Sequence, residues 1–166
     1  EINRAELMKV MVYGWLGYTP ELEYYSNCFS DVEEEWYAPY VCYAYEQGWV
    51  EGYTDGYFHP ENPVTKVEAL KMILESYEAD VPETASVASL PYDDVYSSAW
   101  YAPYLVTAYE LGLLEEGEGS FNPNESRTRA EVTEEILRLL VIDIMGAEMY
   151  DEDLHEDFMD FWGEYF

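Results

Sequence analysis

The feature that most constrains this sequence is an internal repeat. The block Trp-Tyr-Ala-Pro-Tyr at residues 36–40 returns at residues 100–104, 64 positions later. Phe58-His59-Pro60 matches Phe121-Asn122-Pro123, 63 positions later, so the second copy is one residue shorter in between. A unit of this size is too small to close a core alone, so a chain with this period is expected to fold as one array of units that share a core.

The closing part of the unit occurs a third time, at the start of the chain, where residues 2–7 match residues 64–69 and 127–132. Because the chain starts in mid-repeat and without Met, we expect a fragment, a processed product or an incompletely resolved subunit. The sequence predicts five segments: a closing half-repeat at 1–17, a complete repeat at 28–78, a linker at 79–91, a second complete repeat at 92–142 and an acidic tail at 143–166.

Hydrophobic spacing predicts two helices in each complete repeat. The first begins near the Trp-Tyr-Ala-Pro-Tyr block, where a proline is tolerated in the first turn of a helix. The second follows a tight turn and is expected at residues 65–77 and 128–142, and a matching helix is expected at residues 2–15. The predicted fold class is therefore mainly α, made of tandem helix-loop-helix repeats with short extended segments.

Short motifs recur in register inside the repeat: Phe29-Ser30-Asp31-Val32, Gly52-Tyr53-Thr54-Asp55-Gly56-Tyr57-Phe58 and Val64-Thr65-Lys66-Val67-Glu68, with Trp36, Gly48 and Pro60 between them. They resemble the S-layer homology (SLH) domain, which typically reads F-x-D-V, W, G-Y-x-D-G-x-F-x-P and T-R-A-E. The resemblance covers about residues 2–13, 29–77 and 92–140. It implies a pseudo-threefold array in an extracellular protein of the bacterial cell surface or S-layer.

The resemblance also implies a ligand. SLH grooves bind cell-wall polysaccharide, often one that carries an acidic pyruvylated sugar, and the basic residue of the T-R-A-E motif is the main anion contact. The Gly-Asp loop and an aromatic residue assist it. Carried over to this sequence, the candidate glycan-binding residues are Arg4, Lys66, Arg129, Asp55, Gly56, Trp36 and Trp100.

The physical chemistry of the T-R-A-E positions allows two interpretations. Thr65 with Glu68 has the form of a capping box at a helix start, and the basic residue beside the cap opposes the helix dipole. Either a local acidic partner such as Glu68 or Glu131 compensates it, or a bound anionic sugar does. Repeat two replaces the Asp-Gly turn with residues 115–119, Glu-Glu-Gly-Glu-Gly, which are expected to repel an anionic glycan.

The two cysteines, Cys28 and Cys42, are present together in repeat one and absent together from repeat two, where Pro91 and Val106 replace them. Two isolated buried thiols would not need to be lost together. A disulfide is therefore expected, and it fits an extracytoplasmic protein. Two small core residues are the alternative, whereas two cysteines and a stray histidine are too few for a zinc site.

The net charge of −29 argues against binding to nucleic acid or to an anionic membrane and favours cations or basic partners. No apolar run approaches a membrane span. Carboxylate clusters at 33–35, 93–94 and 151–153 could hold Ca²⁺ diffusely, but none has Ca-loop spacing, so no specific metal site or cofactor is expected. His59 and His155 lack a partnered nucleophile, and the sequence contains no catalytic constellation, so we do not expect an enzyme.

The tail lies outside the repeat and carries an apolar stripe at helical spacing. We expect it to fill the place beside the helix at 2–15, in the same chain or in a neighbouring subunit, and a tail packed on repeat two alone would contradict this. The candidate assembly residues are Leu154, Phe158, Phe161, Trp162 and Tyr165.

Two functions from different classes follow. The first is a non-catalytic module that anchors a protein to the cell envelope through cell-wall polysaccharide. The second is a subunit that self-assembles through its tail and its tyrosine-rich faces into a surface layer, sheath or extracellular filament, as a homo-oligomer or polymer. A third reading, an acidic mimic of nucleic acid, rests on charge alone.

Overall fold

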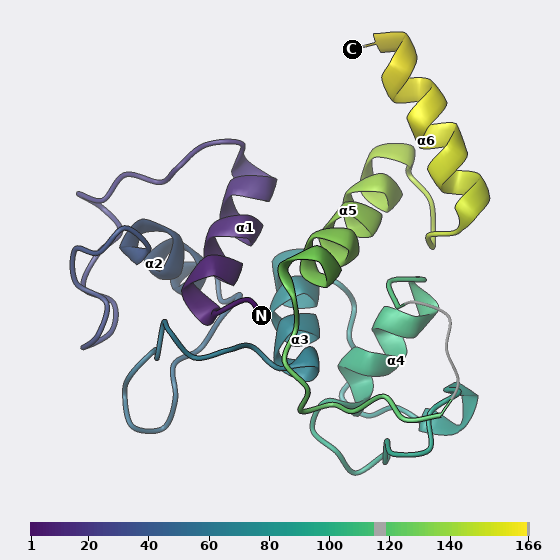
Figure 1. Cartoon of the computed structure of the whole chain (residues 1–166), viewed down its shortest axis with the longest axis horizontal. Helices are drawn as coiled ribbons and strands as arrows, with labels where there is room; N and C mark the ends of the chain where they lie inside the picture. Colours follow the sequence, from purple (N-terminus) through teal and green to yellow (C-terminus); the bar gives the residue numbers. More distant parts are fainter. Residues whose placement is uncertain (115–118, 166) are drawn as a thin grey trace.

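The chain is mainly helical, as the sequence predicts. The computed structural model describes residues 1–114 and 119–165 (Figure 1). In these ranges extended chain pairs only in isolated bridges, and a short 3₁₀ turn at Val87–Ser89 lies in the linker. The α-helices are α1 (Arg4–Leu16), α2 (Ala38–Glu46), α3 (Lys66–Ser76), α4 (Ala102–Glu110), α5 (Arg129–Met145) and α6 (Glu152–Tyr165).

Helices α1, α3 and α5 begin with the same local structure. Each is preceded by an extended cap residue whose side chain accepts a hydrogen bond from the backbone N–H three residues on. The carboxylate of the glutamate at that third position accepts a hydrogen bond from the backbone N–H of the cap residue. This reciprocal arrangement satisfies two of the N–H groups that a helix start leaves free. The cap and glutamate pairs are Asn3 with Glu6, Thr65 with Glu68 and Thr128 with Glu131.

A closed ring of backbone hydrogen bonds joins the residues that precede these three caps. The Ile2 N–H donates to the Arg127 carbonyl at 2.9 Å, and the Arg127 N–H donates to the Val64 carbonyl at 2.8 Å. The Val64 N–H closes the ring on the Ile2 carbonyl at 3.1 Å. Three equivalent residues in one ring give the array its pseudo-threefold axis, which the half-repeat at the start of the chain completes.

The helices pack around this axis in a fixed order. Helices α1, α3 and α5 contact one another in all three pairs, and together they form the centre of the molecule (Figure 1). Helix α2 packs on α1, and α4 packs on α3, so the front helix of each repeat covers the closing helix of the preceding one. This interlocking buries one continuous apolar core through both repeats.

The aspartate of the F-x-D-V motif fixes the loop of its own repeat. The Asp31 carboxylate accepts hydrogen bonds from the N–H groups of Phe58 and His59, both at 2.8 Å. Asp94 does the same for Phe121 and Asn122, both at 2.7 Å. His59 and Asn122 have positive φ angles, so the carboxylate holds a turn that a non-glycine residue seldom adopts.

A disulfide joins Cys28 to Cys42, with the two Cα atoms 5.5 Å apart. It ties the opening segment of repeat one to α2 and is the bridge that the paired loss of both cysteines in repeat two led us to expect. The Cys42 side chain is buried in the core, and Cys28 packs against it.

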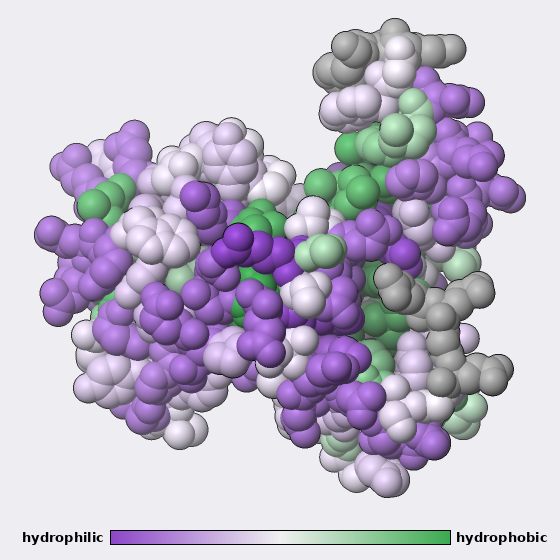
Figure 2. Space-filling model, viewed as in Figure 1, coloured by the Kyte–Doolittle hydropathy of each residue, from purple (hydrophilic) through white to green (hydrophobic). Residues whose placement is uncertain are grey.

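The expectation that the tail fills the place beside the helix at 2–15 is wrong. Helix α6 packs on α5, and Tyr150, which precedes it, donates its N–H to the Leu111 carbonyl of repeat two at 2.9 Å. The physical reason lies in the packing order: α1 is already covered by α2 and α3 by α4, whereas no front helix of a described repeat covers α5. Helix α6 takes that role, and Figure 2 shows apolar surface where α5 and α6 meet.

Candidate functional site

Arg4 on α1 is largely buried and bonds to the loop of repeat one. Its Nε donates to the Phe58 carbonyl at 2.9 Å, and one terminal nitrogen donates to the Glu51 carbonyl at 3.1 Å. The guanidinium lies over the rings of Tyr53 and Phe58. Burial lowers the pKa of Arg4, and Tyr53 is the largest of the groups that oppose this shift. Arg4 therefore holds the loop of repeat one from the helix of the preceding copy.

Lys66 repeats this arrangement one copy later. Its Nζ donates to the Phe121 carbonyl at 3.0 Å and lies 2.6 Å from a carboxylate oxygen of Glu125. The ammonium also lies over the Phe121 ring. Each of these two basic residues thus secures the loop of the following repeat.

Arg129 differs from the other two because it does not bond to a loop of a described repeat. Its side chain is 65% exposed and pairs with Glu6 on α1. None of the three basic residues pairs with the glutamate of its own capping box: Lys66 pairs with Glu125, Arg129 pairs with Glu6, and Glu68 acts on Arg4 through its charge. The residues that compensate them belong to the next copy around the axis, which helix spacing alone cannot reveal.

A groove with a volume of about 270 Å³ lies where repeat one meets repeat two. We call it the first groove. Helix α1 contributes Arg4 and the loop contributes Trp49, Gly52 and Tyr53. Helix α3 contributes Glu68, Lys71 and Met72, and the turn before α4 contributes Trp100. Trp100 is 56% exposed, and within the described part of the chain Lys71 forms one long ion pair, with Glu51 at 3.5 Å. The structure therefore brings Arg4 and Trp100 together, but Lys71 is the more accessible cation.

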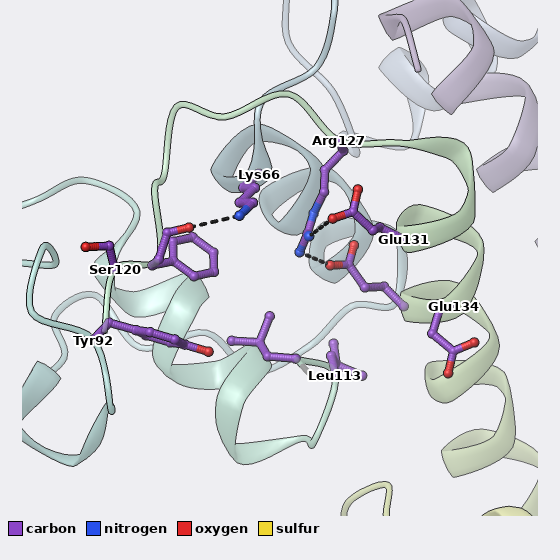
Figure 3. Close-up of a pocket in the computed structure, with 10 residues that line it drawn as sticks. Lys66, Tyr92, Leu113, Ser120, Arg127, Glu131 and Glu134 are labelled. Atoms are coloured by element: carbon purple, nitrogen blue, oxygen red, sulfur yellow. Dashed lines mark hydrogen bonds and ion pairs between the residues drawn. The ribbon is translucent and has the colours of Figure 1, made fainter. Parts of the chain in front are cut away.

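A second groove, of about 210 Å³, occupies the equivalent place one repeat later. Figure 3 shows Lys66 and Arg127 facing Tyr92 and Leu113 across it. The charge of its lining differs from that of the first groove. Glu134 and Glu135 stand where α3 carries Lys71 and Met72, 63 positions earlier.

The second groove contains an ion pair that the sequence analysis missed. Arg127 reaches down to Glu131 at 3.0 Å and to Glu135, whose side chain is 4% exposed. Burial raises the pKa of Glu135 to about 7, against the opposing charge of Arg127. The signal was present in the repeat: Val64 and Met72, both apolar, align with Arg127 and Glu135, and two matching changes to charged residues indicate a contact.

The remaining glycan candidates lie apart from the two grooves. Trp36 is about half exposed, and Lys9 on α1 lies over its ring at 5.5 Å. Asp55 accepts a hydrogen bond from the Tyr57 N–H and lies 2.7 Å from the His59 ring nitrogen. The bond from Tyr57 lowers the pKa of Asp55 most, and the contact with His59 lowers it further. Gly56 has φ of 84°, as its turn requires. The acidic segment of repeat two at 115–118 lies outside the described residues.

The sequence profile of the S-layer homology domain matches residues 29–70 and 91–133, more than half of the chain. The chain belongs to the S-layer homology family. The predicted SLH array and the fold that it implies are therefore confirmed.

Relatives match through the same repeats. An amylopullulanase of Thermoanaerobacterium thermosulfurigenes is 32% identical over 78% of this chain and 7% of its own length. A middle cell wall protein of Brevibacillus brevis is 27% identical over 94% of the chain and 14% of its length. A cellulosome-anchoring protein of Acetivibrio thermocellus is 32% identical over 49% of the chain and 19% of its length. The chain thus spans a small part of each relative, and the predicted cell-surface location agrees with the family.

The tail of this SLH chain divides its candidate residues. Phe158 is buried and Leu154 packs against the core, so both serve the contact with α5. Phe161 and Trp162 are 39% and 44% exposed, and the side chain of Tyr165 lies outside the described residues. Among the described residues, no helix is long and apolar enough to cross a membrane.

In the described residues, each of the three carboxylate clusters includes a side chain that accepts a hydrogen bond from a backbone N–H. Glu35 accepts a bond from the Glu33 N–H, Asp94 holds the loop of repeat two, and Asp151 caps α6 through the Leu154 N–H at 2.7 Å. No three His, Cys, Asp or Glu side chains of the described residues gather as a metal site would require.

Proposed function

We propose that this chain is a non-catalytic SLH module that attaches a larger protein to the bacterial cell envelope by binding cell-wall polysaccharide in the first groove. The relatives support a shared attachment role, because proteins with names as different as an amylopullulanase and a middle cell wall protein match through a similar small segment. Catalysis would not be common to them.

The observation that carries the proposal is the exposed Trp100 ring, which repeat two contributes to a groove of repeat one. An aromatic face stacks on the apolar face of a sugar ring, and Tyr53 supplies a second aromatic wall with a polar tip. A stacking platform beside a cation fits an acidic sugar.

The anion contact that we propose is Lys71. The hydrogen bonds of Arg4 go to backbone carbonyls, and its guanidinium is covered by two rings. Lys71 has a 33% exposed side chain, and its partner Glu51 is exposed to solvent, so a ligand carboxylate can displace that weak pair. Arg4 then acts as a positioning residue that shapes the groove.

Co-sedimentation of the chain with purified bacterial cell-wall polysaccharide tests this proposal. Trp100→Ala and Lys71→Ala should each weaken binding roughly tenfold, the size of one lost stacking or charged contact. Trp36→Ala is the matched control, because Trp36 is the equivalent residue with similar exposure outside the first groove. Equal losses in the two tryptophan variants would remove the first groove as the site.

The alternative function is self-assembly, for which α6 is the specific observation. It extends from the body of the molecule in Figure 1, and Ile144, Met149 and Met159 along this end are about half exposed. Light scattering on the chain, and on a variant with serine at these three positions, tests it. Large particles that only the unaltered chain forms would favour assembly, and monomers in both would exclude it.

A further inference from the structure

Helix α5 is longer than its counterpart in repeat one. It begins with the same capping box as α3, but it has 17 residues, Arg129–Met145, whereas α3 has 11, Lys66–Ser76. The last turns of α5, residues 140–145, therefore have no counterpart in α3. They lead into α6, which extends from the body of the molecule in Figure 1. We call residues 140–165 the projection.

The projection leaves apolar side chains exposed. Phe158 is buried and Leu154 packs against the core, so these two residues make the contact with α5. Ile144, Met149 and Met159 are 47%, 49% and 54% exposed. Figure 2 shows apolar surface along one side of the projection and hydrophilic surface along the other. Two packed helices share one contact face only, and apolar surface that remains open beside it is typical of a binding site.

Methionine is concentrated in the projection. The chain has six methionines, and Met145, Met149 and Met159 lie in this part of it. The other three are buried in the body: Met8, Met11 and Met72. Methionine is unbranched and flexible, so its side chain fits the irregular surface of a partner.

The projection also carries a strong negative charge. From residue 139 to the end, the sequence has nine Asp and Glu residues and no Lys or Arg. A hollow of about 780 Å³ at the base of α6 combines carboxylates with apolar side chains. Its lining includes Tyr109, Leu114, Met149, Asp151, Glu152 and Asp153. Arg138 also lines it, but this cation is paired with Glu134 at 3.1 Å.

The charge determines which partner fits the projection. A second copy of the chain would bring nine more acidic residues to the same surface, and like charges that meet at an interface oppose binding. A second copy also has few cations to offer, because the chain has seven Lys and Arg in all and Arg4 and Arg127 are buried. A partner with Lys and Arg side chains would instead meet carboxylates.

We propose that the projection binds a basic amphipathic helix of another protein. The apolar residues of that helix cover Ile144, Met149 and Met159, as the third helix of a small bundle would, and its Lys and Arg side chains pair with the acidic residues around them. This inference does not depend on the function proposed for the first groove. It also differs from self-assembly, in which a second copy occupies the same surface.

NMR titration of the full chain with synthetic peptides tests the proposal. The probe is a peptide of about 18 residues, built from leucine and lysine as an amphipathic helix. A scrambled peptide of the same composition controls for charge, and a peptide with glutamate in place of lysine controls for the apolar face.

The amphipathic lysine peptide should bind at least about tenfold more tightly than either control, and it should shift the methyl signals of Ile144, Met149 and Met159. Equal binding of either control peptide, or shifts spread evenly over the body of the molecule, would overturn the proposal.

A variant with serine at positions 144, 149 and 159 separates the apolar contact from attraction by charge. It should remain folded by circular dichroism, because the three side chains are about half exposed, and it should bind the lysine peptide at least about tenfold more weakly. Leu22→Ser is the matched control, since Leu22 is 40% exposed in the connector after α1, and it should bind as the unaltered chain does. Unchanged affinity in the triple variant would contradict the proposal. Particles in light scattering that the unaltered chain forms and the triple variant does not would also contradict it, because a second copy would then be the occupant.

Discussion

The guanidinium carbon of Arg4 lies 4.5 Å from the centre of the Phe58 ring, although the two residues are 54 positions apart. The same guanidinium donates to the carbonyl of Phe58, so one side chain fixes both the ring and the backbone of the loop. The T-R-A-E arginine at this position is therefore a structural link between consecutive copies.

Arg4→Ala should lower the free energy of unfolding by roughly 2–4 kcal/mol, because it removes charge-assisted bonds and cation–π contacts and takes the Arg4 donor away from the buried Phe58 carbonyl. Arg129→Ala is the control at the equivalent position. Its exposed ion pair with Glu6 should contribute about 1 kcal/mol or less. Urea denaturation of both variants measures the difference, and equal losses would contradict the structural role of Arg4.

The loop of repeat one gives a second prediction. Asp31→Asn keeps one acceptor for the N–H groups of Phe58 and His59 and replaces the other with a donor, so it should destabilise the chain by about 1–3 kcal/mol. Asp55→Asn changes an exposed carboxylate in the same loop and should have a much smaller effect. Thermal unfolding followed by circular dichroism compares them, and a smaller shift for Asp31 would be evidence against this anchor.

Local signals in the sequence predicted the helices well. The capping boxes at Asn3, Thr65 and Thr128 depend on neighbours within three residues, and helix α5 was misjudged only at its end, Met145. The repeat itself predicted the array, because a copied pattern implies a copied fold.

Contacts between copies were less predictable. The partners of Arg4 and Lys66 lie in the next repeat, and helix spacing carries no information on them. The tail was placed on the wrong helix because the sequence does not state the packing order, in which each front helix covers the preceding closing helix. A position-by-position comparison of the two repeats would have predicted the ion pair of Arg127 with Glu135, because both residues replace apolar ones, Val64 and Met72.

Reduction of the Cys28–Cys42 disulfide gives a third prediction. The bridge closes a loop with a sequence separation of 14, for which the chain-entropy estimate is about 3 kcal/mol. The double variant Cys28→Ser with Cys42→Ser should therefore unfold at a distinctly lower urea concentration. Reductant should shift the unaltered chain towards the variant and leave the variant unchanged. A reductant effect on the variant would show that something other than this bridge responds.

The buried carboxyl of Glu135 predicts how stability depends on pH. Burial raises its pKa from the ordinary 4.5 to about 7 in the folded chain. Between these values the folded state keeps a proton that the unfolded state releases, so the favourable contribution is complete below about pH 4.5 and is lost as the pH rises through about 7. The full loss is at most roughly 3 kcal/mol.

Unfolding free energies of the chain and of Glu135→Gln at a series of pH values test this prediction, because glutamine carries no titrating proton. The stability of the chain relative to the variant should fall as the pH rises from about 4.5 to about 7.

Glu131→Gln is the control with the opposite sign. Burial raises the pKa of Glu131, but bonds from Thr128 and the charge of Arg127 outweigh burial and lower it. The ionised Glu131 carboxylate therefore stabilises the folded chain above its ordinary pKa of 4.5, and this stabilisation is lost as the pH falls below that value. If both variants shift in the same direction with pH, then the repulsion among the 36 acidic residues, and not the burial of Glu135, controls the dependence.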